Sequence, residues 1–283
     1  MSLSATVGTV RPVTAVDLPA VERILASDPV AHCLVTSRVR AGGVDPWRLG
    51  GEILGFYDDE GLLSLVYQGA NLVPVETDPR SRSAFVDRLR RMGRRSSSLV
   101  GPADEVLDLW RLLEPAWGPA REVRERQPVL IIDEDPQVPA DPRVRPATLE
   151  DLDVLVPACV AMFTAEVGVS PVARGMAAAY RARIAEIVAS GHSFVRIENG
   201  VVIFKAEVGV ATERVCQVQG VWVDPAHRGR GLSVPAMAAV VELARESISP
   251  VVSLYVNDFN TAARRCYATV GFRSHGDFAT VLF

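Results

Sequence analysis

The chain has 283 residues, of which 48% are hydrophobic and 23% charged, which is typical of a soluble protein with room for two domains. Its 30 basic and 34 acidic residues leave a formal net charge of −4, which argues against nucleic acid or a membrane surface as a partner. No apolar run reaches the roughly 20 residues of a bilayer span, and residues 1–12 lack the features of a secretory signal. We therefore expect a cytoplasmic protein.

The cysteines and histidines indicate neither a metal site nor a redox pair. Cys33, Cys159, Cys216 and Cys266 are far apart, with no Cys-x-x-Cys pair, and the four histidines do not cluster. We expect each cysteine to be a small buried apolar residue.

A segment near the start recurs in the second half of the chain. Residues 10–18 read VRPVTAVDL and residues 144–152 read VRPATLEDL, an offset of 145 − 11 = 134 residues. Each copy predicts a short strand, then Thr14 or Thr148 as a helix N-cap, then an acidic first turn. A repeat this long indicates a duplicated domain.

A proline-rich stretch separates the two copies. The sequence DEDPQVPADPR contains Pro136, Pro139 and Pro142, and proline at this density favours an extended, stiff linker. We therefore predict an N-terminal domain at residues 1–135, a linker at 136–142 and a C-terminal domain at 143–283.

The first half continues as strands followed by helices. Residues 51–76 read as three strands with turns at 58–61 and 69–71, while the glycine-bearing stretch 38–43 reads as an earlier loop. The remaining expected elements are a basic helix at Ser81–Met92, a strand at Ser97–Val100 and a helix at Ala103–Leu113.

The second half repeats this order. A helix at Met176–Ala189 precedes strands at Ser193–Glu198 and Val201–Val208, which Asn199-Gly200 joins as a hairpin turn. A third strand, Val215–Val223, leads into a glycine-bearing turn and a helix that begins near Val234.

That turn has the composition of an anion site. Gly229 and Gly231 let the backbone approach phosphate oxygens, and Arg228 and Arg230 can neutralise their charge. The helix that follows directs its unpaired N–H groups and its dipole toward the same place. Taken alone, Arg-Gly-Arg-Gly could equally be a solvated loop.

The surrounding sequence resembles the GNAT N-acetyltransferase superfamily. There the coenzyme A signature is Arg or Gln, two residues, Gly, one residue, then Gly or Ala; this chain has Arg228 and Gly231 but departs at Ser233. Downstream, a strand at Val251–Val256, the stretch Asn257 to Asn260, a helix at Thr261–Val270 and Gly271-Phe272 continue the resemblance, which covers residues 143–283.

The resemblance implies a fold and a set of binding residues. The fold class would be α/β (α+β): tandem GNAT-like folds, each with a mixed, mostly antiparallel sheet flanked by helices. The backbones of Val221 and Val223 would pair with pantetheine, Asn257 and Asn260 would approach it, and Gly220 would lie where two parallel strands splay apart. The pyrophosphate would be held by Arg228, Gly229, Arg230, Gly231, Leu232 and Ser233.

The resemblance also implies a proton donor, Tyr267, for the departing thiolate. Tyr267 follows Asn260 by seven residues, which places both on one helix face. The base stays open: Glu207 is the best candidate, although a surface charge ladder with Lys205 explains it as well. Water held by Gln217 or Gln219, or His192, are the alternatives.

The expected function is transfer of an acetyl group from acetyl-CoA, as a substrate, to a primary amine, without a metal. A longer acyl group, a hydroxyl acceptor, or a non-catalytic acyl-CoA sensor are alternatives. The acceptor is unidentified, and a homo-oligomer is compatible with the sequence. In the first half, residues 72–76 run into Thr77-Asp78-Pro79 without a Gly-x-Gly turn. We therefore expect a degenerate domain that binds no coenzyme A and either walls the acceptor site or mediates assembly.

Overall fold

The computed structural model describes residues 8–283 and divides into two compact units. Unit 1 contains the chain up to Val129 together with Tyr255–Phe259 and His275–Phe283, and unit 2 contains Leu130–Leu254 and Asn260–Ser274. Part of the expectation that no secretory signal is present falls on residues 1–7, which lie outside the described residues. The two units do not follow sequence order, because two segments from late in the chain belong to unit 1.

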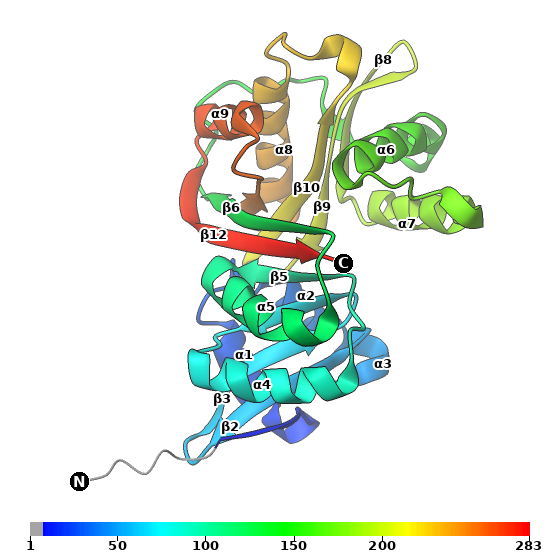
Figure 1. The fold of residues 1–283 in the computed structure, drawn as a ribbon. Helices are drawn as coiled ribbons and strands as arrows, with labels where there is room; N and C mark the ends of the chain where they lie inside the picture. Colours follow the sequence, from blue (N-terminus) through cyan, green and yellow to red (C-terminus); the bar gives the residue numbers. More distant parts are fainter. Residues whose placement is uncertain (1–7) are drawn as a thin grey trace. The chain divides into compact units, whose positions relative to one another are not determined.

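Unit 1 is a sheet with helices on both faces, α4 and α5 lying in front of the sheet and α1 and α2 behind it (Figure 1). Its strands are β1 (Thr9–Pro12), β2 (Glu52–Asp58), β3 (Gly61–Gln68), β4 (Asn71–Val75), β5 (Ser98–Pro102), β6 (Glu122–Ile132, of which 122–129 belong here) and β12 (Arg273–Leu282). Its helices are η1 (Ala15–Asp17), α1 (Leu18–Leu25), α2 (Cys33–Gly42), α3 (Pro46–Leu49), α4 (Pro79–Met92) and α5 (Ala103–Trp117).

The sheet of unit 1 has the order β1-β2-β3-β4-β5-β12-β6. Strands β1 to β4 pair antiparallel, β4 and β5 pair in parallel, and β5 pairs antiparallel with β12. Ala279 and Val281 of β12 are fully buried in a core with Phe85, Leu89 and Leu109 from α4 and α5. Strand β12 therefore completes both the sheet and the core of unit 1.

Unit 2 places α6 and α7 on one side of β9 and β10, and α8 and α9 on the other (Figure 1). Its strands are β7 (Arg145–Pro146), β8 (Ser193–Glu198), β9 (Val201–Ala211), β10 (Val215–Val223) and β11 (Val251–Tyr255), in the order β11-β10-β9-β8-β7. Its helices are η2 (Leu149–Asp151), α6 (Leu152–Val167), η3 (Ala173–Gly175), α7 (Ala177–Ala189), η4 (Pro225–His227), α8 (Ser233–Ser247) and α9 (Thr261–Val270). Each unit is thus a mixed, mostly antiparallel sheet flanked by helices, as predicted.

The parallel pair β10 and β11 separates partway along its length. Pairing runs from Val215 with Val251 to Gln217 with Ser253 and then stops, although β10 continues to Val223. Beyond this point Gly220 takes a left-handed backbone with φ of 60°, and the register between β10 and β9 shifts between Gln219 and Trp222. The sheet therefore opens beside the last residues of β10.

The repeated segment forms the same local structure twice. Arg11 binds Asp17 at 2.9 Å, and Arg145 binds Asp151 at 2.7 Å. In each copy the aspartate also accepts the backbone N–H of the preceding threonine, Thr14 or Thr148, at the start of the helix. In both copies the same spacing thus lets one aspartate carboxylate link the strand to the start of the helix.

The proline-rich stretch packs onto unit 2. Asp141 is buried, and its carboxylate accepts a hydrogen bond from the buried Arg196 of β8 at 2.8 Å. The backbone N–H of Gln137 donates to the carbonyl of Val270, and that of Asp141 donates to Pro235. These contacts anchor the segment along its length.

One expectation on secondary structure was wrong, and two strands were missed. Residues 38–42 of the predicted loop form the end of α2, because Val35 and Val39 supply a buried helical face. Strands β6 and β12 were not predicted, since their partners lie far away in the sequence. Within the described residues no helix is long and apolar enough to cross a bilayer.

Candidate active site

A cavity of about 450 Å³ lies in unit 2 where β10 ends and α8 begins. It is lined by Val221, Trp222, Val223, His227, Arg228, Gly229, Gly231, Leu232, Ser233, Asn260, Ala262, Ala263, Cys266 and Tyr267. One strand, one turn and two helices therefore converge on it, in the part of the sheet that opens.

The turn after β10 is fixed by Asp224. Its carboxylate accepts the backbone N–H of Ala226 at 2.9 Å and contacts Nδ1 of His227 at 2.8 Å. The hydrogen bond with His227 lowers the pKa of Asp224, so the carboxylate is ionised at neutral pH. Arg228 Nε donates to the carbonyl of Val223 at 3.1 Å, which leaves the rest of its guanidinium at the rim of the cavity.

Gly229 and Gly231 are required by the shape of this turn. Their φ angles are 73° and 72°, in the left-handed region that side chains disfavour, and no heavy atom lies within 4 Å of the position of an added Cβ. The space beside both glycines is therefore open. Helix α8 starts directly afterwards, and its N-cap Leu232 offers no side-chain acceptor to the first-turn N–H groups.

Helix α9 supplies the other wall. Asn260 caps it by accepting the backbone N–H of Ala263 at 3.2 Å, and Tyr267 lies two turns further along on the cavity side. Tyr267 is 6% exposed and packs against Phe272 with ring centroids 5.6 Å apart. Burial raises the pKa of its phenol, so the hydroxyl keeps its proton at neutral pH.

Glu207 of β9 lies beside the opening in the sheet. Its carboxyl carbon is 3.2 Å from the position of an added Cβ at Gly220. Its carboxylate accepts a hydrogen bond from Gln219 Nε2 at 3.2 Å and forms an ion pair with Lys205 Nζ at 3.2 Å. The Glu207 side chain is 10% exposed. Lys205 in turn contacts Met162 of α6, so this group faces α6 while Tyr267 belongs to α9 on the other side of the sheet (Figure 1).

The structure brings nine of the twelve predicted site residues to the cavity wall and leaves three outside it. Those at the wall are Val221, Val223, Arg228, Gly229, Gly231, Leu232, Ser233, Asn260 and Tyr267. Arg230 is exposed and does not line the cavity, and Glu207 lies behind Gly220. Asn257 belongs to unit 1, where its side-chain carbonyl accepts a hydrogen bond from Gln127 at 2.8 Å.

Several lining residues were not foreseen from the sequence. Ala262, Ala263 and Cys266 precede Tyr267 by five, four and one residues, and the two alanines leave room at the wall. Only Ala263, four residues before Tyr267, has the helical spacing of a shared face, and that spacing is a signal that could have found it. The pKa of Cys266 is raised by burial, so it remains a neutral thiol. Among the described residues no group of three or more His, Cys, Asp or Glu side chains could hold a metal ion.

A second cavity of about 580 Å³ adjoins the first and shares Trp222 and Arg228 with it. Its other walls are mainly apolar and come from α6, including Pro157, Ala158 and Ala161, and from the start of β9. Trp222 and Arg228 therefore line both a polar turn and an apolar groove.

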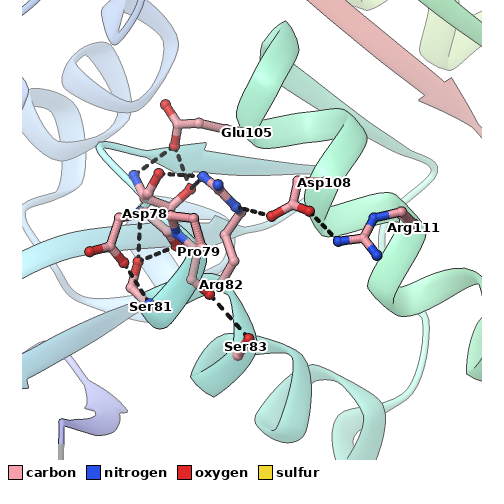
Figure 2. Close-up of polar contacts among 9 residues, drawn as sticks. Asp78, Pro79, Ser81, Arg82, Ser83, Glu105, Asp108 and Arg111 are labelled. Atoms are coloured by element: carbon pink, nitrogen blue, oxygen red, sulfur yellow. Dashed lines mark hydrogen bonds and ion pairs between the residues drawn. The ribbon is translucent and has the colours of Figure 1, made fainter. Parts of the chain in front are cut away.

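The corresponding helix start in unit 1 is filled by the protein itself (Figure 2). Asp78 caps α4 by accepting the backbone N–H of Ser81 at 2.7 Å. A carboxylate oxygen of Glu105 accepts both the backbone N–H and the hydroxyl of Thr77, at 2.7 and 2.6 Å. Arg82 is held by Asp108 at 2.6 Å. The groups that could bind an anion here are thus already engaged by carboxylates.

Two family models match successive parts of the chain. The sequence model of the acetyltransferase (GNAT) family matches residues 161–272, and that of a domain of unknown function, DUF4081, matches residues 51–155. No curated protein matches the chain.

Solved structures resemble the chain along nearly its whole length. A GNAT-family acetyltransferase from Colwellia psychrerythraea is 14% identical with a TM-score of 0.56, covering 97% of this chain and 99% of that one. A GCN5-related N-acetyltransferase from Sphaerobacter thermophilus is 17% identical with a TM-score of 0.59, covering 96% and 94%. A tandem GNAT protein from the clavulanic acid biosynthesis pathway is 14% identical with a TM-score of 0.53, covering 97% and 98%.

At these identities the structural likeness shows the fold, and the family match shows the kind of domain. The predicted resemblance is confirmed: the chain has the tandem GNAT fold, and its residues 161–272 match the model of the acetyltransferase (GNAT) family.

Proposed function

We propose that unit 2 binds acetyl-CoA in the 450 Å³ cavity and transfers its acetyl group to a primary amine by direct attack. The observation that carries the proposal is the convergence of the Arg228–Ser233 turn and Tyr267 on one cavity, beside the point where β10 and β11 part. A GNAT-family domain supports acyl transfer in general terms.

The residues at the turn fit a pyrophosphate. Two left-handed glycines leave open space, Arg228 provides a cation, and the first turn of α8 provides N–H groups without a side-chain cap. Ser233 is the first residue of α8 and itself lines the cavity, which remains open beside Gly229 and Gly231. The departure from the family signature at Ser233 is thus compatible with binding in our proposal.

Tyr267 would donate a proton to the departing sulfur. Its raised pKa keeps the phenol protonated, which makes it a hydrogen-bond donor toward the developing thiolate. Asn260, whose side chain also caps α9, would face the pantetheine arm together with the backbones of Val221 and Val223. Asn257 is not part of the proposed site, because its side-chain carbonyl accepts a hydrogen bond from Gln127 in unit 1.

Glu207 would accept the proton of the attacking amine. Its carboxylate lies against Gly220, one residue before the cavity-lining segment that starts at Val221. Gln219, a predicted water-holding residue, donates to that carboxylate, and His192 has its pKa lowered by burial in a loop after α7. These contacts favour Glu207 over the alternatives as the base of the proposed reaction.

Calorimetric titration with acetyl-CoA tests the binding half of the proposal. We expect one site per chain in the wild type and loss of binding in Gly231→Glu, because the new carboxylate would occupy and repel the pyrophosphate position. Gly191→Glu is the matched control: Gly191 has a φ of 73° and equally open surroundings but lies outside the cavity.

Release of free CoA thiol from acetyl-CoA, measured with spermidine, lysine amide and a short unblocked peptide, tests the transfer half. Acetylation of an amine in the panel supports the proposal. Binding without any release above the buffer rate would instead favour the acyl-CoA sensor. Equal binding by wild type and Gly231→Glu would remove the Arg228–Ser233 turn from the site.

A further inference from the structure

Lys205 is the only lysine in the chain: 29 of its 30 basic residues are arginines. The described arginines lie mostly at the surface, whereas Lys205 is 0% exposed and belongs to the middle of β9. A buried ammonium loses its hydration, which costs several kcal/mol unless a partner compensates. The burial of the single lysine of the chain therefore calls for a physical explanation.

The surroundings of Lys205 offer one strong acceptor. Its Nζ is 3.2 Å from Oε2 of Glu207 and 3.4 Å from the sulfur of Met162. Its third neighbour is the thiol of Cys159, whose pKa is raised by burial, so that this sulfur carries no charge. Sulfur is a weak acceptor, and among the described residues around Nζ it is therefore Glu207 that balances the ammonium.

The side chain of Lys205 is buried more deeply than that of Glu207. The Glu207 side chain is 10% exposed, and Lys205 is not exposed at all. Lys205 therefore cannot touch a substrate itself, and any effect it has on one passes through Glu207.

Two glycines make room for this arrangement. An added Cβ at Gly209 would lie 2.1 Å from the Gln219 amide carbon, so Gly209 lets Gln219 reach Glu207. An added Cβ at Gly220 would lie 3.1 Å from Lys205 Nζ, on a left-handed backbone that already disfavours a side chain. The carboxylate is thus held from one side by Gln219 and from the other by Lys205.

We propose that Lys205 is a positioning residue, which holds the Glu207 carboxylate beside Gly220 so that it can take a proton from the acceptor amine. The inference rests on the proposed function. In the step, the protonated amine gives one proton to Glu207 and its freed lone pair attacks the thioester carbon. The carbon–sulfur bond breaks, the departing thiolate takes the proton of Tyr267, and the surplus proton on the new amide nitrogen restores the Tyr267 phenol. Lys205 takes no part in this proton transfer and supplies only orientation and charge.

The pair is not explained by stability alone. Buried ion pairs are often replaced by apolar side chains without loss of stability. The variant Lys205→Met/Glu207→Gln, which removes both charges, is therefore expected to melt no more than a few degrees below wild type. A lysine needed only for folding would make this double variant strongly unstable.

A double-mutant cycle on turnover is the first test. Glu207→Gln keeps the shape of the side chain but accepts no proton, and Lys205→Met removes the ammonium at similar length. We expect Lys205→Met to lower kcat by about 10²-fold, as misplacement of a catalytic group does, while KM for acetyl-CoA stays within twofold. In the Glu207→Gln background Lys205→Met should have no further effect, because a residue that acts through Glu207 has nothing left to position.

A spectroscopic readout on the wild type does not depend on any substitution. Protein grown with lysine labelled with ¹⁵N at Nζ gives a single side-chain resonance, since the chain has one lysine. We expect this resonance to move when acetyl-CoA is added to the wild type.

The outcomes separate the two levels of proposal. Absence of acetyl-CoA binding by calorimetry would overturn the proposed function and the role of Lys205 with it. Retained binding with an unmoved Nζ resonance, or losses of kcat that multiply in the double variant, would overturn only the role of Lys205.

Discussion

Tyr267 illustrates how a residue acquires a role from its surroundings. Its spacing from Asn260 places it on the inner face of α9, and the buried position that follows raises the pKa of its phenol. A protonated hydroxyl at the cavity wall is suited to meet a leaving sulfur. The same burial makes it a poor source of negative charge, so it cannot also be the base.

Replacing Tyr267 by Phe removes that hydroxyl and little else. We expect turnover to fall by roughly 10²-fold or more, the usual size of a general-acid contribution, with acetyl-CoA affinity within about twofold by calorimetry. Ring packing against Phe272 is kept, so the melting temperature should be nearly unchanged. Wild-type turnover in Tyr267→Phe would exclude the residue from the chemistry.

At the scale of elements, short-range sequence patterns predicted much of the fold. The helix start at Thr148, the turn at Asn199-Gly200 and the helix α9 depend on residues a few positions apart, and all appear in the structure. Strand β12 depends instead on pairing with β5, which no local pattern reveals. The sequence placed Lys205 and Glu207 on one face, but their burial under α6 follows only from the packing of Cys159 and Met162.

The site was predictable to the same extent. The turn from Arg228 to Ser233 was predicted because strand, turn and helix follow one another directly, and Tyr267 was predicted from the resemblance of the sequence around it. The resemblance also implied that Asn257 approaches pantetheine, yet the chain crosses into unit 1 at Tyr255–Phe259. Only three-dimensional contacts, such as that with Gln127, reveal this.

The start of α6 should make folding stability sensitive to acid. The hydrogen bond from Arg145, aided by the Thr148 N–H, lowers the pKa of Asp151 to about 2. An unfolded aspartate has a pKa of about 3.9, so the ionised form favours the folded state above that pH. This contribution should shrink as the pH falls from about 4 through 2.

Asp151→Asn, compared with wild type in urea unfolding at pH 7 and at pH 3, checks this expectation. The variant should be less stable at pH 7, and the difference should narrow at pH 3. Asp153→Asn is the control, since the Asp153 side chain is 86% exposed and pairs with the partly exposed Arg181. A difference that is independent of pH would mean that the carboxylate charge does not stabilise this helix start.

At the scale of the molecule, unit 1 contains residues from both ends of the described chain. Ala279 and Val281 of β12 belong to its core, and β5 gains its second neighbour from the same strand. The first half of the chain is therefore not a complete folding unit, and an isolated fragment such as residues 1–138 is unsuited to test what unit 1 binds.

Deletion of residues 275–283 tests this organisation. We expect unit 1 to lose its cooperative unfolding transition by circular dichroism and to become sensitive to protease, because a core strand is removed and a strand edge is exposed. Asp277→Ala is the control: it alters an exposed position of the same strand and should change stability by no more than about 0.5 kcal/mol. A deleted chain that unfolds like wild type would show that β12 is dispensable.

Because β12 lies at the end of the described chain, its pairing with β5 is delayed during synthesis. About 170 residues separate the end of β5 at Pro102 from the start of β12 at Arg273. At ribosomal rates of about 5–20 residues per second, this distance takes roughly 10–30 s. For that interval the nascent chain carries β5 with one edge unpaired, which is when chaperones would have most to protect.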